Sequence, residues 1–199
     1  MTTSPAQADL FGGAAPAHDP GGKVRIRLAS GMVGDARFHG ERDEYRLWLS
    51  RHWGDPDAPY ALWIGMNPST ADALVDDPTV AREVAYTRDT LKLTRYVKAN
   101  MLDIRLTDSK ELRKLGATAR SEMNLPTILS LAEKAERIIV CYGVLHKSLQ
   151  PFAAETVKAL EGRGHKLWCL GTSQAGHPKH PLYLKKSTPL TPFALPEAA

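Results

Sequence analysis

The chain has 199 residues, of which 43% are hydrophobic and 24% are charged, and these values are typical of one soluble globular domain. No apolar run approaches the roughly 20 residues of a membrane span, and residues 1–22 lack the basic start and apolar core of a signal peptide. We therefore expect a cytoplasmic protein without a membrane partner. The net charge of +4 permits contact with nucleic acid, although Lys and Arg are spread along the chain rather than gathered in one arm.

The N-terminal part of the chain contains two sections of different composition. Residues 1–22 are rich in Ala, Pro, Gly and Asp and are predicted to be disordered or loosely packed. Residues 23–28 alternate between basic and apolar side chains, which predicts an exposed strand. Residues 35–39 and 45–51 would extend it into a small antiparallel unit. A short helix over residues 41–53 is the alternative.

Buried strands alternate with helices in the rest of the chain. The apolar run from Tyr60 to Met66 predicts a strand, and Asp77 followed by Pro78 predicts the start of a helix that extends to about Leu91. The same patterns predict further elements in this order: a strand at 94–100, a helix from Asp108 to about Leu115, a helix from Ser121 to Ala135, a strand at 137–142, a helix at 148–162 and a strand at 165–170. The Pro-rich segment from Lys185 onward is predicted to be irregular.

The two cysteines, Cys141 and Cys169, both lie in apolar runs typical of strands. This position predicts buried, reduced thiols. Two cysteines alone cannot supply a four-cysteine iron–sulfur cluster or a structural zinc site.

This alternation of strands and helices predicts an α/β fold with three αβα layers and a parallel central sheet. We expect a single domain over residues 23–187 and a C-terminal tail over 188–199. Right-handed crossovers bring the C-terminal ends of parallel strands to one edge of the sheet, where α/β proteins bind their ligands. Four loops would meet there, at residues 67–77, 100–108, 143–148 and 171–183.

The loop after the first buried strand carries Asn, Ser, Thr and three Asp residues. Asn67 can orient a water or recognise an amide edge, but it is a poor general base. Asp77 is expected to cap the following helix, which leaves Asp76 to face the cleft as a base or a metal ligand. An interpretation without a site is also open, in which this loop only connects a strand to a helix.

The last of the four loops carries two histidines three residues apart, His177 and His180, with Lys179 between them. A His pair can bind a metal with a carboxylate from another loop. A His beside a Lys can instead stabilise a developing anion or a phosphate. The chain contains neither the glycine pattern of a phosphate-binding loop nor that of a dinucleotide-binding turn, and no serine stands in a nucleophile elbow.

Three short motifs in these loops resemble one known family. They are Asn-Pro-Ser-Thr-Ala-Asp at 67–72, Asp-Asp-Pro-Thr at 76–79 and Gly-His-Pro-Lys-His-Pro-Leu-Tyr-Leu at 176–184. They look like the domain of unknown function 1643 (DUF1643) family, over roughly residues 40–185. The family name carries no activity.

The four strand ends also resemble, more distantly and in the same order, those of the uracil-DNA glycosylase superfamily. Gly65-Met66-Asn67-Pro68 is similar to its water-activating motif, and Asn100 is similar to the Asn that reads the uracil edge. Tyr142-Gly143 is similar to the Trp-Gly that ends its third strand. His180-Pro181-Leu182 is similar to the loop that supplies an anion-stabilising His, although His177-Pro178-Lys179 aligns equally well.

This resemblance implies a central sheet of four parallel strands in the order 2-1-3-4, and hydrolysis of an N-glycosidic bond in nucleic acid or a nucleotide. A flipped nucleotide would enter the cleft. Asn67 would position a water, Asn100 would hold the base, and His180 or His177 with Lys179 would stabilise the leaving base, without metal or cofactor. The expected catalytic residues are Asn67, His180 and Asp76. The expected substrate-binding residues are Pro68, Ser69, Thr70, Asp72, Asn100, Gly143, His177 and Lys179.

Two other functions remain open at this point. The stacking aromatic expected soon after the first motif is not evident between Pro68 and Val80, so the chain could be a non-catalytic module that binds nucleic acid or nucleotides. Alternatively, Asp76, His177 and His180 could form the centre of a metal-dependent hydrolase.

Overall fold

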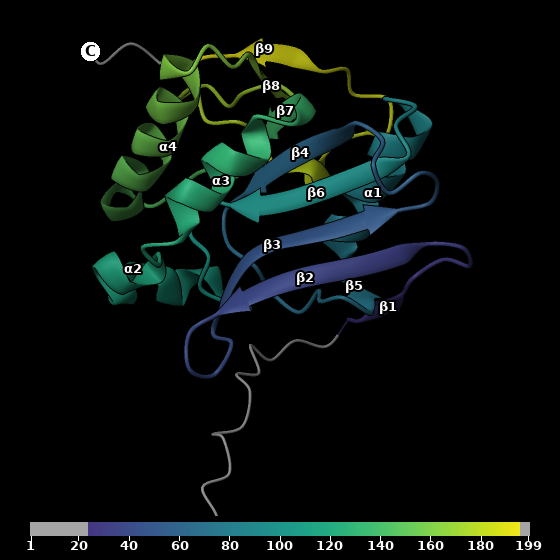
Figure 1. Ribbon diagram of the computed structural model, residues 1–199. Coiled ribbons are helices and arrows are strands. Elements are labelled where there is room, and N and C mark those ends of the chain that lie inside the picture. The colour runs from purple at the N-terminus through teal and green to yellow at the C-terminus, as the bar shows by residue number, and fades with distance from the viewer. Residues whose placement is uncertain (1–23, 196–199) are drawn as a thin grey trace, which may run out of the picture.

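The computed structural model describes residues 24–195 and contains one seven-stranded sheet with helices on both faces (Figure 1). Across the sheet the strands are β2 (Val33–His39), β3 (Tyr45–His52), β6 (Arg95–Asn100), β4 (Tyr60–Gly65), β7 (Ala135–Val140), β8 (Leu167–Cys169) and β9 (Thr191–Phe193). A separate ribbon pairs β1 (Ile26–Arg27) with β5 (Val75–Asp76).

The four buried strands that the sequence predicted are the centre of this sheet. β6, β4, β7 and β8 are parallel neighbours, and in chain order they are the second, first, third and fourth of the set, as expected. The prediction of a four-stranded, wholly parallel sheet was wrong, because antiparallel strands continue it on both sides. The β2–β3 hairpin pairs with β6, and β9 pairs with β8. These additions satisfy backbone groups that would otherwise be open along both edges of the parallel strands.

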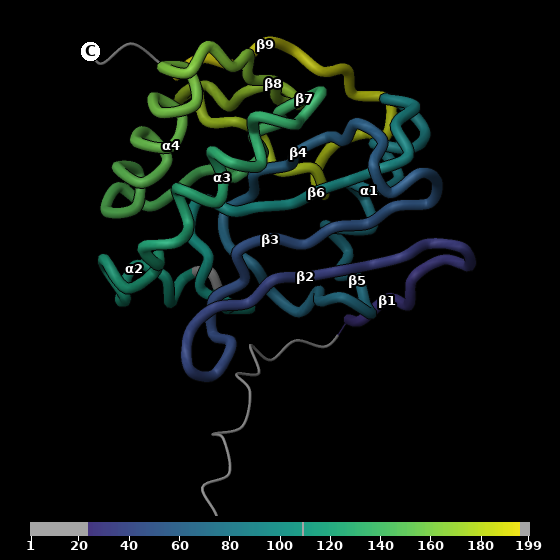
Figure 2. The backbone as a smooth tube through the Cα atoms, viewed as in Figure 1, coloured from purple at the N-terminus to yellow at the C-terminus, as the bar shows by residue number. Residues whose placement is uncertain are grey.

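The antiparallel N-terminal unit is confirmed as strands β2 and β3, so the alternative helix over 41–53 is wrong. The expected strand at 23–28 is reduced to β1. The prediction for residues 1–22 lies outside the described residues. Residues 191–193, which we expected to be irregular, form β9, and the chain returns to run beside β8 (Figure 2).

The helices form two outer layers (Figure 1). α1 (Pro78–Asp89) covers one face of the sheet, and α3 (Asn124–Ala132) and α4 (Gln150–Gly162) cover the other. Each face has its own apolar core: Trp63 and Val84 belong to the α1 side, and Ile64 and Val157 to the α3–α4 side. Shorter helices are α2 (Leu112–Leu115) and the 3-10 turns Ser109–Glu111, Gly116–Ala119, Lys147–Leu149 and Pro181–Tyr183.

Each of two helices begins where a side chain is, or is not, available to accept hydrogen bonds from its first N–H groups. Asp77 Oδ1 accepts a hydrogen bond from the Val80 N–H at 2.8 Å, which confirms Asp77 as the N-cap of α1. Ser121 was wrong as a cap, because its hydroxyl and N–H both donate to the Asp103 carboxylate. The helix α3 therefore begins later, at Asn124.

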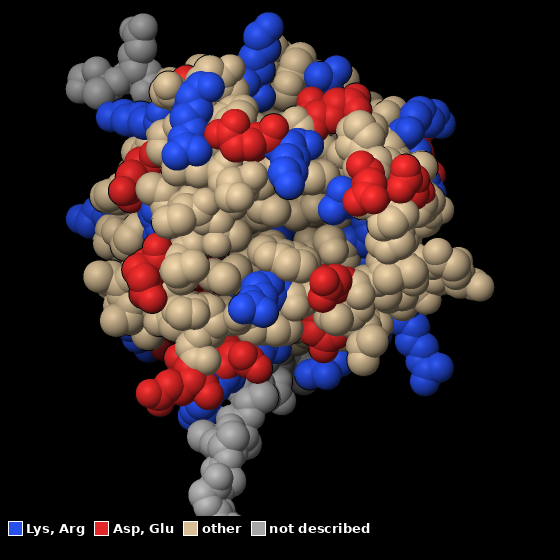
Figure 3. All heavy atoms as spheres, viewed as in Figure 1, with Lys and Arg blue, Asp and Glu red and all other residues tan. Residues whose placement is uncertain are grey.

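Both cysteines are free and buried, as predicted. Among the described residues, no helix has the length and apolar character needed to cross a membrane. Basic and acidic side chains are mixed over the face seen in Figure 3. That face therefore lacks the continuous basic stripe with which many proteins bind a nucleic-acid backbone.

Candidate functional site

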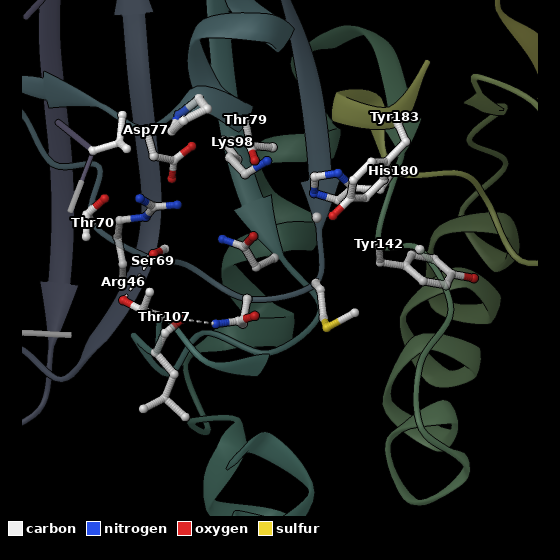
Figure 4. Close-up of a pocket in the computed structure, with 18 of the residues that line it drawn as sticks. Arg46, Ser69, Thr70, Asp77, Thr79, Lys98, Thr107, Tyr142, His180 and Tyr183 are labelled. Atoms are coloured by element: carbon white, nitrogen blue, oxygen red, sulfur yellow. Dashed lines mark hydrogen bonds between the residues drawn. The ribbon is translucent and has the colours of Figure 1, made fainter. Parts of the chain in front are cut away.

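A cavity of about 530 Å³ opens where the C-terminal ends of β4 and β6 meet the turn after β7 (Figure 4). This volume lies in the range usual for small-molecule sites. Six residues expected from the sequence line it: Asn67, Ser69, Thr70, Asn100, Gly143 and His180. Further lining side chains were not expected there, among them Arg46, Asp77, Thr79, Lys98, Tyr142 and Tyr183.

Asn67 is held by its amide nitrogen. Its Nδ2 donates to the carbonyl oxygens of Pro68 at 2.9 Å and Leu106 at 2.7 Å. These bonds fix the orientation of the side chain, and Oδ1 has no hydrogen-bond partner among the described residues. Asn67 can therefore offer the cavity an acceptor, which is what orienting a water requires.

Asn100 is fully buried at the end of β6, and neither Nδ2 nor Oδ1 has a hydrogen-bond partner in the described part of the chain. A buried amide without partners is costly, and such groups in folded proteins generally serve a ligand or a bound water. Gly65 keeps the space beside it open, since a Cβ there would lie 2.9 Å from Asn100 Oδ1 and 3.1 Å from Lys98 Nζ. Asn100 thus presents a donor and an acceptor side by side.

Of the two histidines, His180 lines the cavity and His177 does not. His180 Nδ1 accepts a hydrogen bond from the Leu182 N–H at 3.4 Å, which assigns the proton of the neutral ring to Nε2. Burial and the nearby Lys98 ammonium lower the pKa of His180 below its usual value. His180 is therefore a neutral hydrogen-bond donor at neutral pH. Lys179 is exposed and lies outside the cavity lining.

Two predicted acidic residues are occupied elsewhere. Asp76 was expected to face the cleft, but it is buried against Arg51, whose Nε lies 2.9 Å and Nη2 2.8 Å from Asp76 Oδ1. Burial raises the pKa of Asp76, and Arg51 opposes this shift. Asp72 Oδ1 accepts from the N–H groups of Leu74 and Val75, so it shapes the loop. Neither residue lines the cavity, and Pro68 is buried and also absent from the lining.

A buried ion pair contributes its cation to the cavity wall. Lys98 Nζ is 2.7 Å from both carboxylate oxygens of Glu83 on α1, and Tyr96 and Cys141 also donate to that carboxylate. Burial alone would lower the pKa of Lys98, and the attraction of Glu83 reverses this, so the pKa is raised. Lys98 is therefore a fixed cation in the wall. A Lys between apolar residues of a central strand was the signal in the sequence that could have identified it.

Arg46 is the second buried cation in the wall, and a bulge in β3 determines which face of the sheet it occupies. In register with β2, Trp48 pairs with Arg37 and Arg46 pairs with Phe38, so Leu47 has no partner. This bulge turns Arg46 to the side of the sheet that Arg51 occupies, since both guanidinium groups bond the segment from Ala71 to Asp76. Nη1 of Arg46 donates to Ala71 O at 2.7 Å.

The N-terminus of α1 forms part of the same wall, with Asp77, Pro78 and Thr79 lining the cavity. Figure 4 shows Arg46, Thr70 and Asp77 grouped on one side of the cavity and His180, Tyr142 and Tyr183 on the other. Burial lowers the pKa of Arg46, and the Asp77 carboxylate partly offsets that shift. The two sides of the cavity thus differ in chemistry, one ionic and one aromatic.

No group of three His, Cys, Asp or Glu side chains within residues 24–195 is arranged to hold a metal ion. Asp76, His177 and His180 are therefore not brought together as the metal-dependent hydrolase would require. At the rim, Tyr183 is 86% exposed and its ring lies 5.5 Å from the His180 ring. Tyr183 therefore offers an exposed aromatic ring at the rim of the cavity, whereas the segment between Pro68 and Val80 contains no aromatic residue.

Comparison with known families matches this chain to Protein of unknown function (DUF1643) over residues 46–182. The chain belongs to this family. The match begins at Arg46 and includes His180, so it covers both the ionic side of the cavity and the histidine on its aromatic side. A search of curated proteins found no match, and a search of solved structures found none either.

Proposed function

We propose that this member of the DUF1643 family is a hydrolase that cleaves the N-glycosidic bond of a nucleotide or of a nucleotide unit in nucleic acid. One observation carries the proposal: Asn67, Asn100 and His180, from three segments far apart in sequence, line one cavity. Each has the hydrogen-bonding state that its proposed role needs. The order of the parallel strands, β6-β4-β7-β8, supports the same proposal.

The base would be bound by the buried amide of Asn100. An imide or amide edge of a base offers both an acceptor and a donor, and these would satisfy the unpartnered Nδ2 and Oδ1 of Asn100. A base lacking that pattern would leave the amide unpaired in the interior, which is a strong basis for discrimination.

The chemical step would then use four other groups. Asn67 Oδ1 orients a water whose oxygen bonds to C1′ as the C1′–N bond breaks and its electron pair leaves with the base. The Nε2–H of His180 donates to the departing base, where negative charge develops. Asp77, the carboxylate in the cavity lining, takes the proton released by the water. Lys98 lines the cavity and its partner Glu83 does not, so the positive end of this ion pair faces the anionic base and favours it.

Release of free base tests the proposal. The protein is incubated with DNA containing uracil, hydroxymethyluracil or hypoxanthine, and with the matching nucleotides, and the free base is measured by chromatography. We expect turnover with at least one substrate and a loss of about 100-fold in His180→Gln. His177→Gln is the matched control, because it changes a histidine of the same loop outside the cavity.

Two results would count against hydrolysis. One is no released base across the panel, and the other is turnover that Asn67→Ala and His180→Gln leave unchanged. Base-specific binding that Asn100→Ala abolishes, without any turnover, would assign the cavity to a binding module instead.

A further inference from the structure

We propose that Arg46 forms a phosphate subsite in this cavity, and that the ligand is a free nucleotide whose terminal phosphate docks there. The inference rests on the proposed function for the identity of the ligand as a nucleotide. It adds which end of the nucleotide enters the ionic side of the cavity.

The open edge of the Arg46 guanidinium is the first observation. Arg46 is fully buried, and its Nε and Nη2 have no hydrogen-bond partner among residues 24–195. With Nη1 bonded to Ala71 O, these two N–H groups form one edge of the planar group. Two parallel N–H donors match two oxygens of a phosphate or carboxylate.

Arg51 provides the comparison within the same strand. Its guanidinium is also fully buried, but it is bonded to the Asp76 carboxylate and to the carbonyl oxygens of Ser50, Asp72 and Val75. The chain therefore bonds every nitrogen of one buried guanidinium and leaves two nitrogens of the other, which belongs to the cavity wall, without an acceptor. This contrast indicates that the missing acceptors of Arg46 belong to a ligand.

The surroundings of the open edge favour phosphate. The N-terminus of α1, a helix of 12 residues, lies in the same wall, and its partial positive charge attracts anions. Ser69, Thr70 and Thr79 bring hydroxyl groups to the lining. Arg, Ser, Thr and helix N-termini are the groups that commonly contact phosphate oxygens. Asp77 offsets part of the charge of Arg46 but leaves Nε and Nη2 unbonded.

Burial of the guanidinium favours a terminal phosphate. An internal phosphodiester continues as chain on both sides, and the described residues leave no part of Arg46 at the outer surface where such a chain could pass. A terminal phosphate can enter the cavity whole. With the phosphate at Arg46, the rest of a nucleotide extends toward His180 and Tyr183 on the opposite side (Figure 4).

Calorimetric titration of the full-length protein tests this assignment without requiring turnover. The ligands are a panel of nucleoside 5′-monophosphates, the corresponding nucleosides, inorganic phosphate and a short single-stranded oligonucleotide without terminal phosphates. We expect at least one monophosphate to bind about 10- to 100-fold more tightly than its nucleoside, the effect of hydrogen bonds to a charged group. Inorganic phosphate should compete with it.

The variants separate this subsite from the base site. Arg46→Lys keeps the charge but removes the two-donor edge, and it should abolish the advantage of the monophosphate while nucleoside binding persists. Arg51→Lys is the matched control on the same strand and should keep the advantage, with folding of each variant verified by thermal unfolding. Asn100→Ala should weaken nucleoside and monophosphate alike.

Three results would overturn the assignment. Equal affinity for nucleoside and monophosphate would remove the phosphate subsite while leaving the proposed nucleotide site intact. Arg46-dependent binding of the oligonucleotide, without binding of monophosphates, would show that the phosphate is internal. No binding of any member of the panel would remove both the subsite and the nucleotide ligand.

Discussion

Arg46 and Arg51 share strand β3 and are both fully buried, yet the guanidinium of Arg51 is bonded on all sides and that of Arg46 has two N–H groups without partners in the described chain. An odd separation of five residues would place them on opposite faces of a regular strand. The bulge at Leu47 removes that difference and turns both toward the segment from Ala71 to Asp76.

This contrast predicts opposite effects on stability. Arg51→Met leaves the buried Asp76 carboxylate without its partner and should lower the free energy of unfolding by about 3–5 kcal/mol. Arg46→Met removes an incompletely paired buried charge and should change it by less than about 1 kcal/mol. Urea unfolding measures both. Equal losses would mean that the Arg46 guanidinium is as well bonded as that of Arg51.

Because Lys98 and Glu83 form a buried ion pair, we predict that substitutions of these two residues have strongly non-additive effects on stability. Lys98→Met should destabilise the protein by about 3–5 kcal/mol, because it leaves a buried carboxylate whose remaining donors, Tyr96 and Cys141, are uncharged. The double variant Lys98→Met/Glu83→Leu should be more stable than Lys98→Met alone. A double-mutant cycle measures the coupling free energy, and additive losses would contradict it.

We predict that a side chain at position 65 weakens ligand binding more than it lowers the stability of the fold. A Cβ at this position would approach Asn100 Oδ1 and Lys98 Nζ, and both of these side chains line the cavity. Gly65→Ala should therefore weaken binding of the best ligand about tenfold or more, the effect of disturbing one buried hydrogen-bonded group. Gly162→Ala is the control, since a Cβ there would meet no other part of the described chain within 4 Å beyond its own helix backbone. Unchanged affinity in Gly65→Ala would show that the ligand does not reach Asn100.

His180 predicts a pH dependence of stability. The unfolded chain protonates this residue near pH 6.5, and the folded chain does so at a lower pH because of burial and Lys98. Stability is therefore unaffected above pH 6.5 and falls as the pH decreases from 6.5 to the lowered pKa. Glu83 and Asp77 act in the opposite direction, but the net pKa remains lowered.

The measurement compares thermal unfolding of the wild type and two variants between pH 7.5 and 5. Relative to the wild type, His180→Gln should lose less stability as the pH falls, and His177→Gln should follow the wild type. An NMR titration of the His180 ring should place its pKa below 6.5. A raised pKa would assign a cation, rather than a neutral donor, to this side of the cavity.

Much of the site could be predicted from the sequence because it depends on connectivity. Parallel strands with right-handed crossovers bring their ends together, which is why Asn67, Asn100 and His180 were expected in one place. The residues that were missed owe their positions to contacts with side chains far away in the sequence. Nothing near Asp76 reveals that Arg51 occupies its carboxylate, and nothing near Lys98 reveals Glu83.

Arg46 was missed for a different reason. Strict alternation along residues 45–51 puts Arg46 on the same side as Trp48 and Ser50, and a single unpaired residue reverses that assignment. The backbone register that produces the bulge is set by the partner strand β2. The alternation of side chains within residues 45–51 therefore cannot predict the bulge.

The C-terminal strand β9 also has a consequence for how the chain should be handled in the laboratory. It covers the hydrogen-bonding edge of β8 with residues 191–193. The sequence pattern suggests that the domain ends at residue 187. A truncation there would leave that edge open to strands of other molecules. Shortened expression products would then self-associate as their concentration rises. A soluble fragment for crystallisation should retain residues through at least Phe193.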